Sequence, residues 1–273
     1  MDSFDKENEE SQSGEEGLQT DEDFGHTDKV IGLFTSPTAT FERIAKFPPK
    51  VVDWVIPLII LTLVVVISNL VMMNNQEIAY QVKQKQIEAA EKGINQAVTE
   101  GKMTKEQADA QMTRLEDYFN SPLAKILSTV GIIVVLPIIF FIVTGVYLLL
   151  VKFGLKGDGT YGSALVANGM TLYIGMISVI LAAILAFVFG RILSDVSIAS
   201  LMNSDKSVIS GYLLSKLDII TIWGMVVFSI ALAKMFKSAT TGKYYGLVFG
   251  VWIFWSLFSF WLGKAVPFLN FNR

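Results

Sequence analysis

Two ionisable side chains, Lys216 and Asp218, stand at the start of an apolar run at 219–233, where they could carry chemistry. An aspartate inside a membrane helix bundle could serve a proton or ion path, because a charge in lipid is costly and is kept for a function. Ser215 offers a structural alternative. Ser215 and Asp218 have the Ser-x-x-Asp spacing of a capping box, in which Ser215 caps a helix and an acid in the first turn suits its dipole. The spacing favours the cap, with a buried polar site as the alternative.

Residues 157–162, Gly-Asp-Gly-Thr-Tyr-Gly, match the dinucleotide-binding fingerprint Gly-x-Gly-x-x-Gly letter for letter. That fingerprint follows a strand, opens a soluble helix and is followed about 20 residues later by an acid. Here the motif joins two apolar runs instead. We therefore predict a tight glycine turn, with Thr160 capping the helix that follows it.

Side chains for catalysis are scarce. The chain has one histidine, His26, which lies in a strongly acidic N-terminal region, and it has no cysteine. A histidine-paired nucleophile, a zinc site and a thiolate site are therefore not expected. The aspartates Asp53, Asp158, Asp195 and Asp218 fall at the ends of apolar runs or in adjoining loops. We expect no catalytic residue, no metal site, no cofactor and no enzymatic activity.

Small and polar side chains recur every three or four residues along the apolar run at 161–190. This face consists of Ala164, Asn168, Thr171, Gly175, Ser178, Ala182, Ala186 and Gly190. In lipid, where helices gain little from hydrophobic exclusion, such a face permits close backbone approach. We predict that the part from Gly175 to Gly190 packs against other helices and that this run is the centre of a bundle. Asn168 is expected to form an interhelical hydrogen bond, or alternatively to line a polar path.

The element that positions these residues is a set of membrane-spanning helices. Of the 273 residues, 52% are hydrophobic and 17% are charged, which is typical of a membrane protein. Five uncharged runs lie at 54–73, 126–151, 161–190, 219–233 and 244–263. About 20 helical residues cross the hydrocarbon layer, so the fourth run must use Asp218 and Lys234 at its ends. The sequence predicts an all-α integral membrane protein with a five-span transmembrane helix bundle at 51–265.

Two polar regions surround the first span. Residues 1–28 hold eleven acids and one base, so we expect a disordered acidic tail. Residues 29–50 are amphipathic. A helix opened by Ser36 and Pro37 places Phe41 and Ile44 on one face, which predicts a helix in the membrane interface or, alternatively, in the groove of a partner protein.

The segment between the first two spans is rich in Glu, Lys, Gln and Ala, which is typical of solvated helices. We predict an extramembrane helical hairpin at 76–119, with a turn at Gly101 and a capping box at Thr104 and Gln107. A docking element for a partner is the alternative. Lysines and arginines near the span ends number nine on the side of the N-terminus and five on the other, which predicts a cytoplasmic N-terminus.

Four stretches, in this order, carry a resemblance to a family: LFTSPTATFERI, WVIPLIILTLV, GTYGSALVANGMTLYI and LLSKLDIITIWGMVVFSIAL. Over residues 31–265 the chain resembles the Yip family of Ypt-interacting membrane proteins. Leu214, Leu217, Asp218 and Trp223 are similar to a motif of its bacterial-type members. The resemblance implies a helical membrane protein with a cytoplasmic N-terminal region and no known enzymatic activity. Eukaryotic relatives are associated with Rab-type GTPases, and this chain departs from them in carrying the hairpin.

These observations predict a non-enzymatic membrane scaffold or adaptor that organises proteins or lipids. Its expected partners are the lipid bilayer and other membrane proteins or further copies of itself. GTPase binding is implied only by the family, and no nucleic acid is expected. In a bacterium the protein would lie in the inner membrane. The alternative is a small-solute or ion transporter or channel, which would be expected to show inward-facing ionisable residues or interrupted spans in repeated halves.

Overall fold

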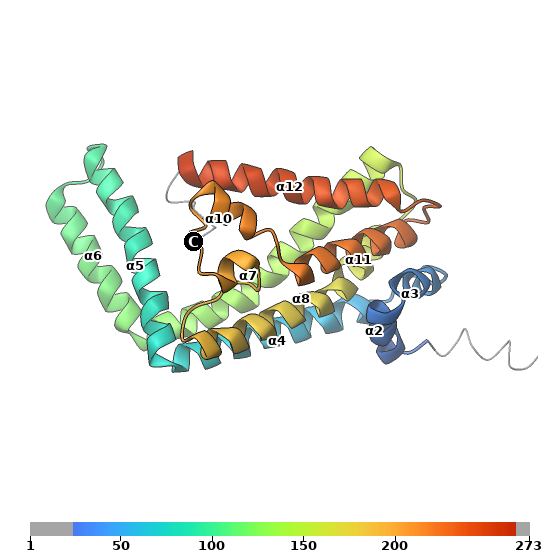
Figure 1. Ribbon diagram of the computed structural model, residues 1–273, viewed down its shortest axis with the longest axis horizontal. Helices are drawn as coiled ribbons and strands as arrows, with labels where there is room; N and C mark the ends of the chain where they lie inside the picture. The colour runs from blue at the N-terminus through green and yellow to red at the C-terminus, as the bar shows by residue number, and fades with distance from the viewer. Residues whose placement is uncertain (1–23, 266–273) are drawn as a thin grey trace, which may run out of the picture.

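A computed structural model describes residues 24–265, which are helical throughout apart from short connections and contain no strand. The helices are α2 (His26–Thr35), α3 (Pro37–Ile44), α4 (Val52–Asn74), α5 (Gln76–Thr99), α6 (Lys105–Asn120), α7 (Pro122–Leu149), α8 (Tyr161–Phe189), α9 (Ile198–Leu201), α10 (Ile209–Leu214), α11 (Ile219–Met235) and α12 (Gly242–Ala265). A π-helical turn, Leu150–Gly154, extends α7. Figure 1 shows α2 and α3 at one end of the long axis and the hairpin of α5 and α6 at the other.

Within residues 24–265, four helices are long and apolar enough to cross a membrane: α4, α7 with its π-helical extension, α8 and α12. The protein is therefore an all-α helical bundle of the membrane-spanning type. Four of the five predicted spans are thus full-length helices, whereas the fourth, predicted to be short, forms α11 with only 17 residues. At 1.5 Å per residue its length is about 25 Å, less than the roughly 30 Å of hydrocarbon.

The fourth segment is made of two helices, α10 followed by α11. After α8, the chain forms α9 and α10 before α11 begins, and α10 lies beside α12 (Figure 1). The hydroxyl of Tyr212 on α10 donates to the carbonyl oxygen of Ser256 on α12, and its ring packs against Phe260 with the ring centroids 4.6 Å apart. The helical path is therefore broken at residues 215–218, between α10 and α11.

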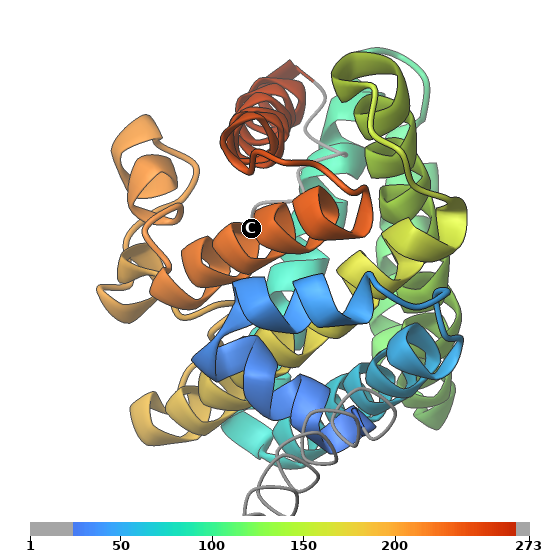
Figure 2. The same cartoon turned by 90° about the vertical axis from the view of Figure 1, so that its right-hand side faces the viewer.

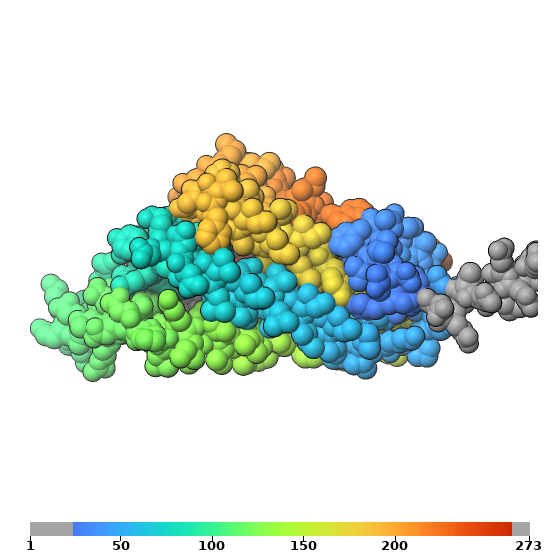
Figure 3. Space-filling view, turned by 90° about the horizontal axis from the view of Figure 1, so that it is seen from below, coloured from blue at the N-terminus to red at the C-terminus, as the bar shows by residue number. Residues whose placement is uncertain are grey.

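Helix α8 is the centre of the bundle, as predicted, because α4, α11 and α7 all pack against it. Figure 3 shows the surfaces of α7, α4 and α8 as neighbouring bands. Of the glycines within α8, Gly169 is the most tightly packed: an added Cβ atom there would lie 2.5 Å from the Cα atom of Trp54 on α4. This glycine, which lies off the predicted small-residue face, sets the distance between α4 and α8.

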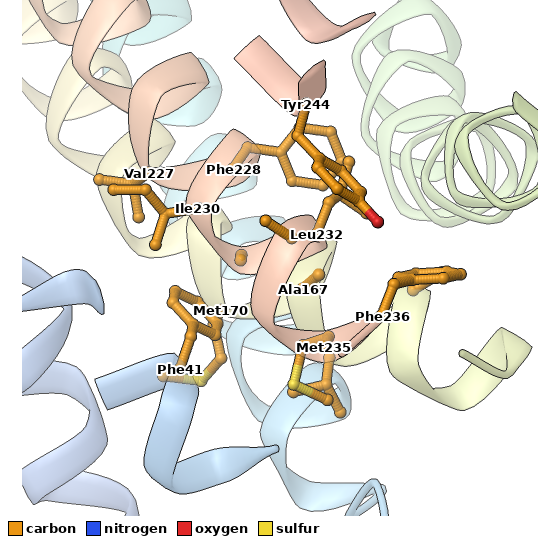
Figure 4. Packing of buried hydrophobic residues seen from close by; sticks show 14 of the residues in the cluster. Phe41, Ala167, Met170, Val227, Phe228, Ile230, Leu232, Met235, Phe236 and Tyr244 are labelled. Carbon is orange, nitrogen blue, oxygen red and sulfur yellow. The ribbon is translucent and has the colours of Figure 1, made fainter. Parts of the chain in front are cut away.

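The pair α2 and α3 packs against the bundle, seen end-on in Figure 2. Phe41 and Ile44 share one face of α3, as predicted, but this face is buried against α8 and α11. Figure 4 shows Phe41 beside Met170 of α8, below α11. The apolar face of α3 is therefore covered by the protein's own helices, and a position of this segment in the membrane interface remains a prediction. Helix α2 begins at His26, so residues 26–28 of the predicted tail are helical, and residues 1–23 lie outside the described part.

The hairpin at 76–119 forms α5 and α6, with Gly101 at a φ of +70° in the turn and the capping box of Thr104 and Gln107 in place. Its base is attached to the end of α8. The Gln81 amide donates to the carbonyl oxygen of Gly190 at 3.0 Å and accepts from the backbone nitrogen of Ile192 at 3.2 Å. The hairpin is thus an extension of the bundle that begins directly where α4 ends.

Candidate functional site

A groove of about 760 Å³ lies between α7 and α12, with α8 and α11 as its floor. It exists because α12 packs mainly against α11, whereas α7 packs against α4 and α8. Bulky apolar side chains form the walls, among them Val146 and Tyr147 of α7 and Trp252 and Trp255 of α12. The groove therefore lies among helices of the membrane-spanning type.

One part of the predicted small-residue face lines this groove, and another part is buried against other helices. Gly175 and Ser178 line the groove, and an added Cβ atom at Gly175 would meet no atom within 4 Å. Ala182 and Ala186 are buried, and Ala186 packs with Ile78 of the hairpin. Gly190 ends α8 in the left-handed conformation, with a φ of +60°. The prediction that the whole face packs against other helices is thus wrong at Gly175, because α7 and α12 diverge on either side of it.

Asn168 forms the interhelical hydrogen bond that the sequence predicts. Its amide nitrogen donates to the hydroxyl oxygen of Thr144 on α7 at 2.7 Å and lies 3.5 Å from the carbonyl oxygen of Phe140. The Thr171 hydroxyl donates to the backbone carbonyl of Asn168 at 2.7 Å. Both residues line the groove, yet their polar groups bond to the helices around them. The floor of the groove is therefore less polar than its residue types indicate.

Asp218, and not Ser215 as predicted, is the residue that caps α11. Its Oδ1 atom accepts from the backbone nitrogens of Ile220 and Thr221 at 2.9 and 3.2 Å, and its Oδ2 atom accepts from the Thr221 hydroxyl at 3.0 Å. Ser215 ends α10 instead, and its hydroxyl donates to the carbonyl oxygen of Tyr212 at 2.6 Å. The predicted role of Ser215 is wrong because the chain is not helical between Ser215 and Asp218, so α11 starts three residues later.

Replacing Asp218 with alanine is expected to lower the free energy of unfolding by about 1–2 kcal/mol, because a helix cap is lost and backbone donors stay buried. Asp218→Asn should have a smaller effect, since the amide oxygen accepts the same backbone bonds. Ser215→Ala is the matched control and should change stability by less than about 0.5 kcal/mol. Denaturant unfolding of the purified protein in detergent measures all three. An equal loss in Ser215→Ala and Asp218→Ala would contradict this assignment.

The other two side chains near this cap lie outside the groove lining. Trp223, part of the predicted motif, lies on α11 and is partly exposed. The Lys216 ammonium group lies 4.4 Å from the centroid of the Tyr212 ring, a favourable cation–π arrangement. Lys216 and Asp218 therefore have separate local partners, and the structure does not bring them together.

A buried polar network that we did not predict joins α2 to α4 and α8. The Lys29 ammonium group donates to the two carboxylate oxygens of Asp53 at 2.8 and 2.7 Å, and both side chains are buried. The Nδ1 atom of His26 lies 3.4 Å from Asp53, and its Nε2 atom lies 2.8 Å from the hydroxyl of Tyr173. The network attaches the N-terminal helix pair to the bundle.

A signal for this network was present in the sequence. His26, Lys29 and Leu33 are spaced three and four residues apart, so a helix that starts at His26 places them on one face. Assigning His26 to a disordered tail hid that spacing. Within the described residues no group of three or more His, Cys, Asp or Glu side chains could hold a metal ion.

A polar hollow of about 620 Å³ lies between α5 and the connection that follows α8. Two of its cations, Arg191 and Lys206, bond within that connection: Arg191 donates to the carbonyl oxygens of Ser200 and Leu201, and Lys206 pairs with Asp195. Burial raises the pKa of Asp195, but hydrogen bonds from Lys206 and two serine hydroxyls outweigh burial and hold the pKa well below its usual range. These bonds hold the connection in a defined shape against the hairpin.

The groove, the N-terminal network and the polar hollow thus all form only where helices distant in the sequence come together. Comparison of the chain with protein-family models, with curated proteins and with solved structures finds no match.

Proposed function

We propose that the protein is a non-enzymatic membrane scaffold that organises lipids, and that the groove between α7 and α12 takes up an apolar chain from the bilayer. The observation that carries this proposal is the groove itself, which has apolar walls and lies among the spanning helices. The resemblance to the Yip family supports a scaffold and remains a prediction. Inner-membrane localisation and a cytoplasmic α2–α3 end belong to the same proposal.

At about 760 Å³, the groove falls within the roughly 300–1,000 Å³ of ordinary small-molecule sites. An apolar groove left empty forgoes the dispersion contacts of its lining atoms. Hydrocarbon chains surround such a groove in a bilayer, so an acyl chain is the occupant most readily available.

The polar groups of the groove argue against a path for ions or small polar solutes. Its lining holds no Asp, Glu, Lys, Arg or His side chain. Thr221, another lining residue, donates its hydroxyl to Asp218, as Asn168 and Thr171 donate to their own helical surroundings. The break between α10 and α11 is a feature that transporters also have. Here, however, the Asp218 carboxylate at that break accepts hydrogen bonds from the backbone of the first turn of α11.

Filling the groove tests this proposal. Gly175→Leu places a side chain in open space, so the fold should be retained while bound lipid is lost. The measurement is the fraction of motionally restricted spin-labelled phospholipid around the purified protein in nanodiscs. Gly250→Leu is the matched control, because Gly250 is exposed on α12, has open space and lies outside the groove lining. The proposal fails if the Gly175→Leu variant restricts as much lipid as the unchanged protein.

A further inference from the structure

We infer that the ligand of this groove is an anionic phospholipid, with an acyl chain between α7 and α12 and its phosphate group at the lysine-bearing turns beside α3. This inference rests on the function proposed above and adds the class of lipid and its orientation. The lipid comes from the surrounding bilayer.

The two walls of the groove lead to these turns. Leu150 lines the groove where α7 ends, and exposed Lys152 follows two residues later. On the other wall, Val248 lines the groove, and exposed Lys243 lies five residues before it in the first turn of α12. The Lys243 ammonium group donates to the carbonyl oxygen of Leu155 at 3.2 Å. The turns after α7 and before α12 therefore meet at one end of the groove.

The charge of these turns is strongly one-sided. Residues 150–160 and 236–243 together hold four lysines, Lys152, Lys156, Lys237 and Lys243, against the single acid Asp158. All four lysines are exposed. Within the groove itself no charged side chain competes for a headgroup. A phosphate held at these turns leaves its acyl chain directed into the apolar part.

This end of the groove also lies at a membrane boundary. The turns connect the ends of α7 and α11 with the starts of α8 and α12. Nearby, Lys234 of α11 pairs with Glu42 of α3 at 2.7 Å, so the polar surface continues onto the N-terminal helix pair. Lysines at such a boundary attract anionic lipids, and the attraction weakens as salt screens the charges.

The experiment compares spin-labelled phosphatidylglycerol with spin-labelled phosphatidylcholine, using the full chain in nanodiscs. We expect the unchanged protein to restrict more phosphatidylglycerol at low salt. Lys152→Gln with Lys243→Gln should lower the relative affinity for phosphatidylglycerol by about 25-fold, since each lysine near a surface is worth about fivefold. Phosphatidylcholine should be unaffected. Lys102→Gln with Lys105→Gln, at the turn of the hairpin, is the matched control and should retain the preference.

Three outcomes separate this inference from the proposed function. Equal restriction of the two lipids by the unchanged protein, with loss of both in Gly175→Leu, would overturn the anionic preference and keep the groove as a lipid site. Restriction of as much of both lipids by Gly175→Leu as by the unchanged protein would overturn both. Cross-linking of two copies through single cysteines introduced at Ile142 and Phe254 of the groove, with no competition from added lipid, would show that a second chain occupies it and would also overturn both.

Discussion

Lys29→Met is expected to lower the free energy of unfolding by about 3–5 kcal/mol, the largest effect of any single change proposed here. It leaves the Asp53 carboxylate buried without its ammonium partner, which costs more than the pair contributes when intact. The contact of His26 with Asp53, at 3.4 Å, is longer than the two bonds from Lys29 and does not replace them. Because these bonds link α2 to α4, the N-terminal helix pair should loosen first.

A double variant gives this prediction a specific signature. Lys29→Met combined with Asp53→Leu removes both charges, so we expect much of the lost stability to return. Denaturant unfolding in detergent, followed by circular dichroism, measures the four members of the cycle. Lys102→Met is the control, because the pair of Lys102 with Glu100 is exposed and should contribute little. Additive losses in the double variant would show that the two charges do not stabilise one another.

Gly169→Ala is expected to lower the free energy of unfolding by about 1–3 kcal/mol, the cost of overpacking a tight contact. The new methyl group would lie 2.5 Å from the Cα atom of Trp54, and a backbone atom cannot move aside as a flexible side chain can. Helices α4 and α8 would therefore have to separate. The melting temperature in detergent should fall accordingly.

The matched control is Gly175→Ala on the same helix. Its added methyl group meets no atom within 4 Å, and alanine favours a helix over glycine by up to about 1 kcal/mol, so stability should be unchanged or raised. If both substitutions destabilise the protein equally, the tight contact at Gly169 does not explain the loss of stability.

The local elements could be predicted from the sequence. Thr160 caps α8 as predicted, Thr104 and Gln107 form the predicted start of α6, and Ser36 with Pro37 opens α3. The signals at Thr160 and Thr104 are complete within four residues, because a cap satisfies backbone groups of its own first turn, and Pro37 suits the first position of α3 because that position needs no backbone donor. The apolar runs likewise predicted α4, α7, α8 and α12, since the thickness of the bilayer requires a known helix length.

The candidate site depended on the tertiary structure. Periodicity shows that Gly175 and Ala186 share a face of α8, but it does not show that Ala186 is covered and Gly175 lies open, because coverage depends on the angles of α7 and α12. The Lys29 and Asp53 pair, and the bond from His26 to Tyr173, join residues 24 and 147 positions apart. Local sequence determines where a helix begins and which side chains share its face, whereas the packing of distant helices decides which of those faces remain free to bind.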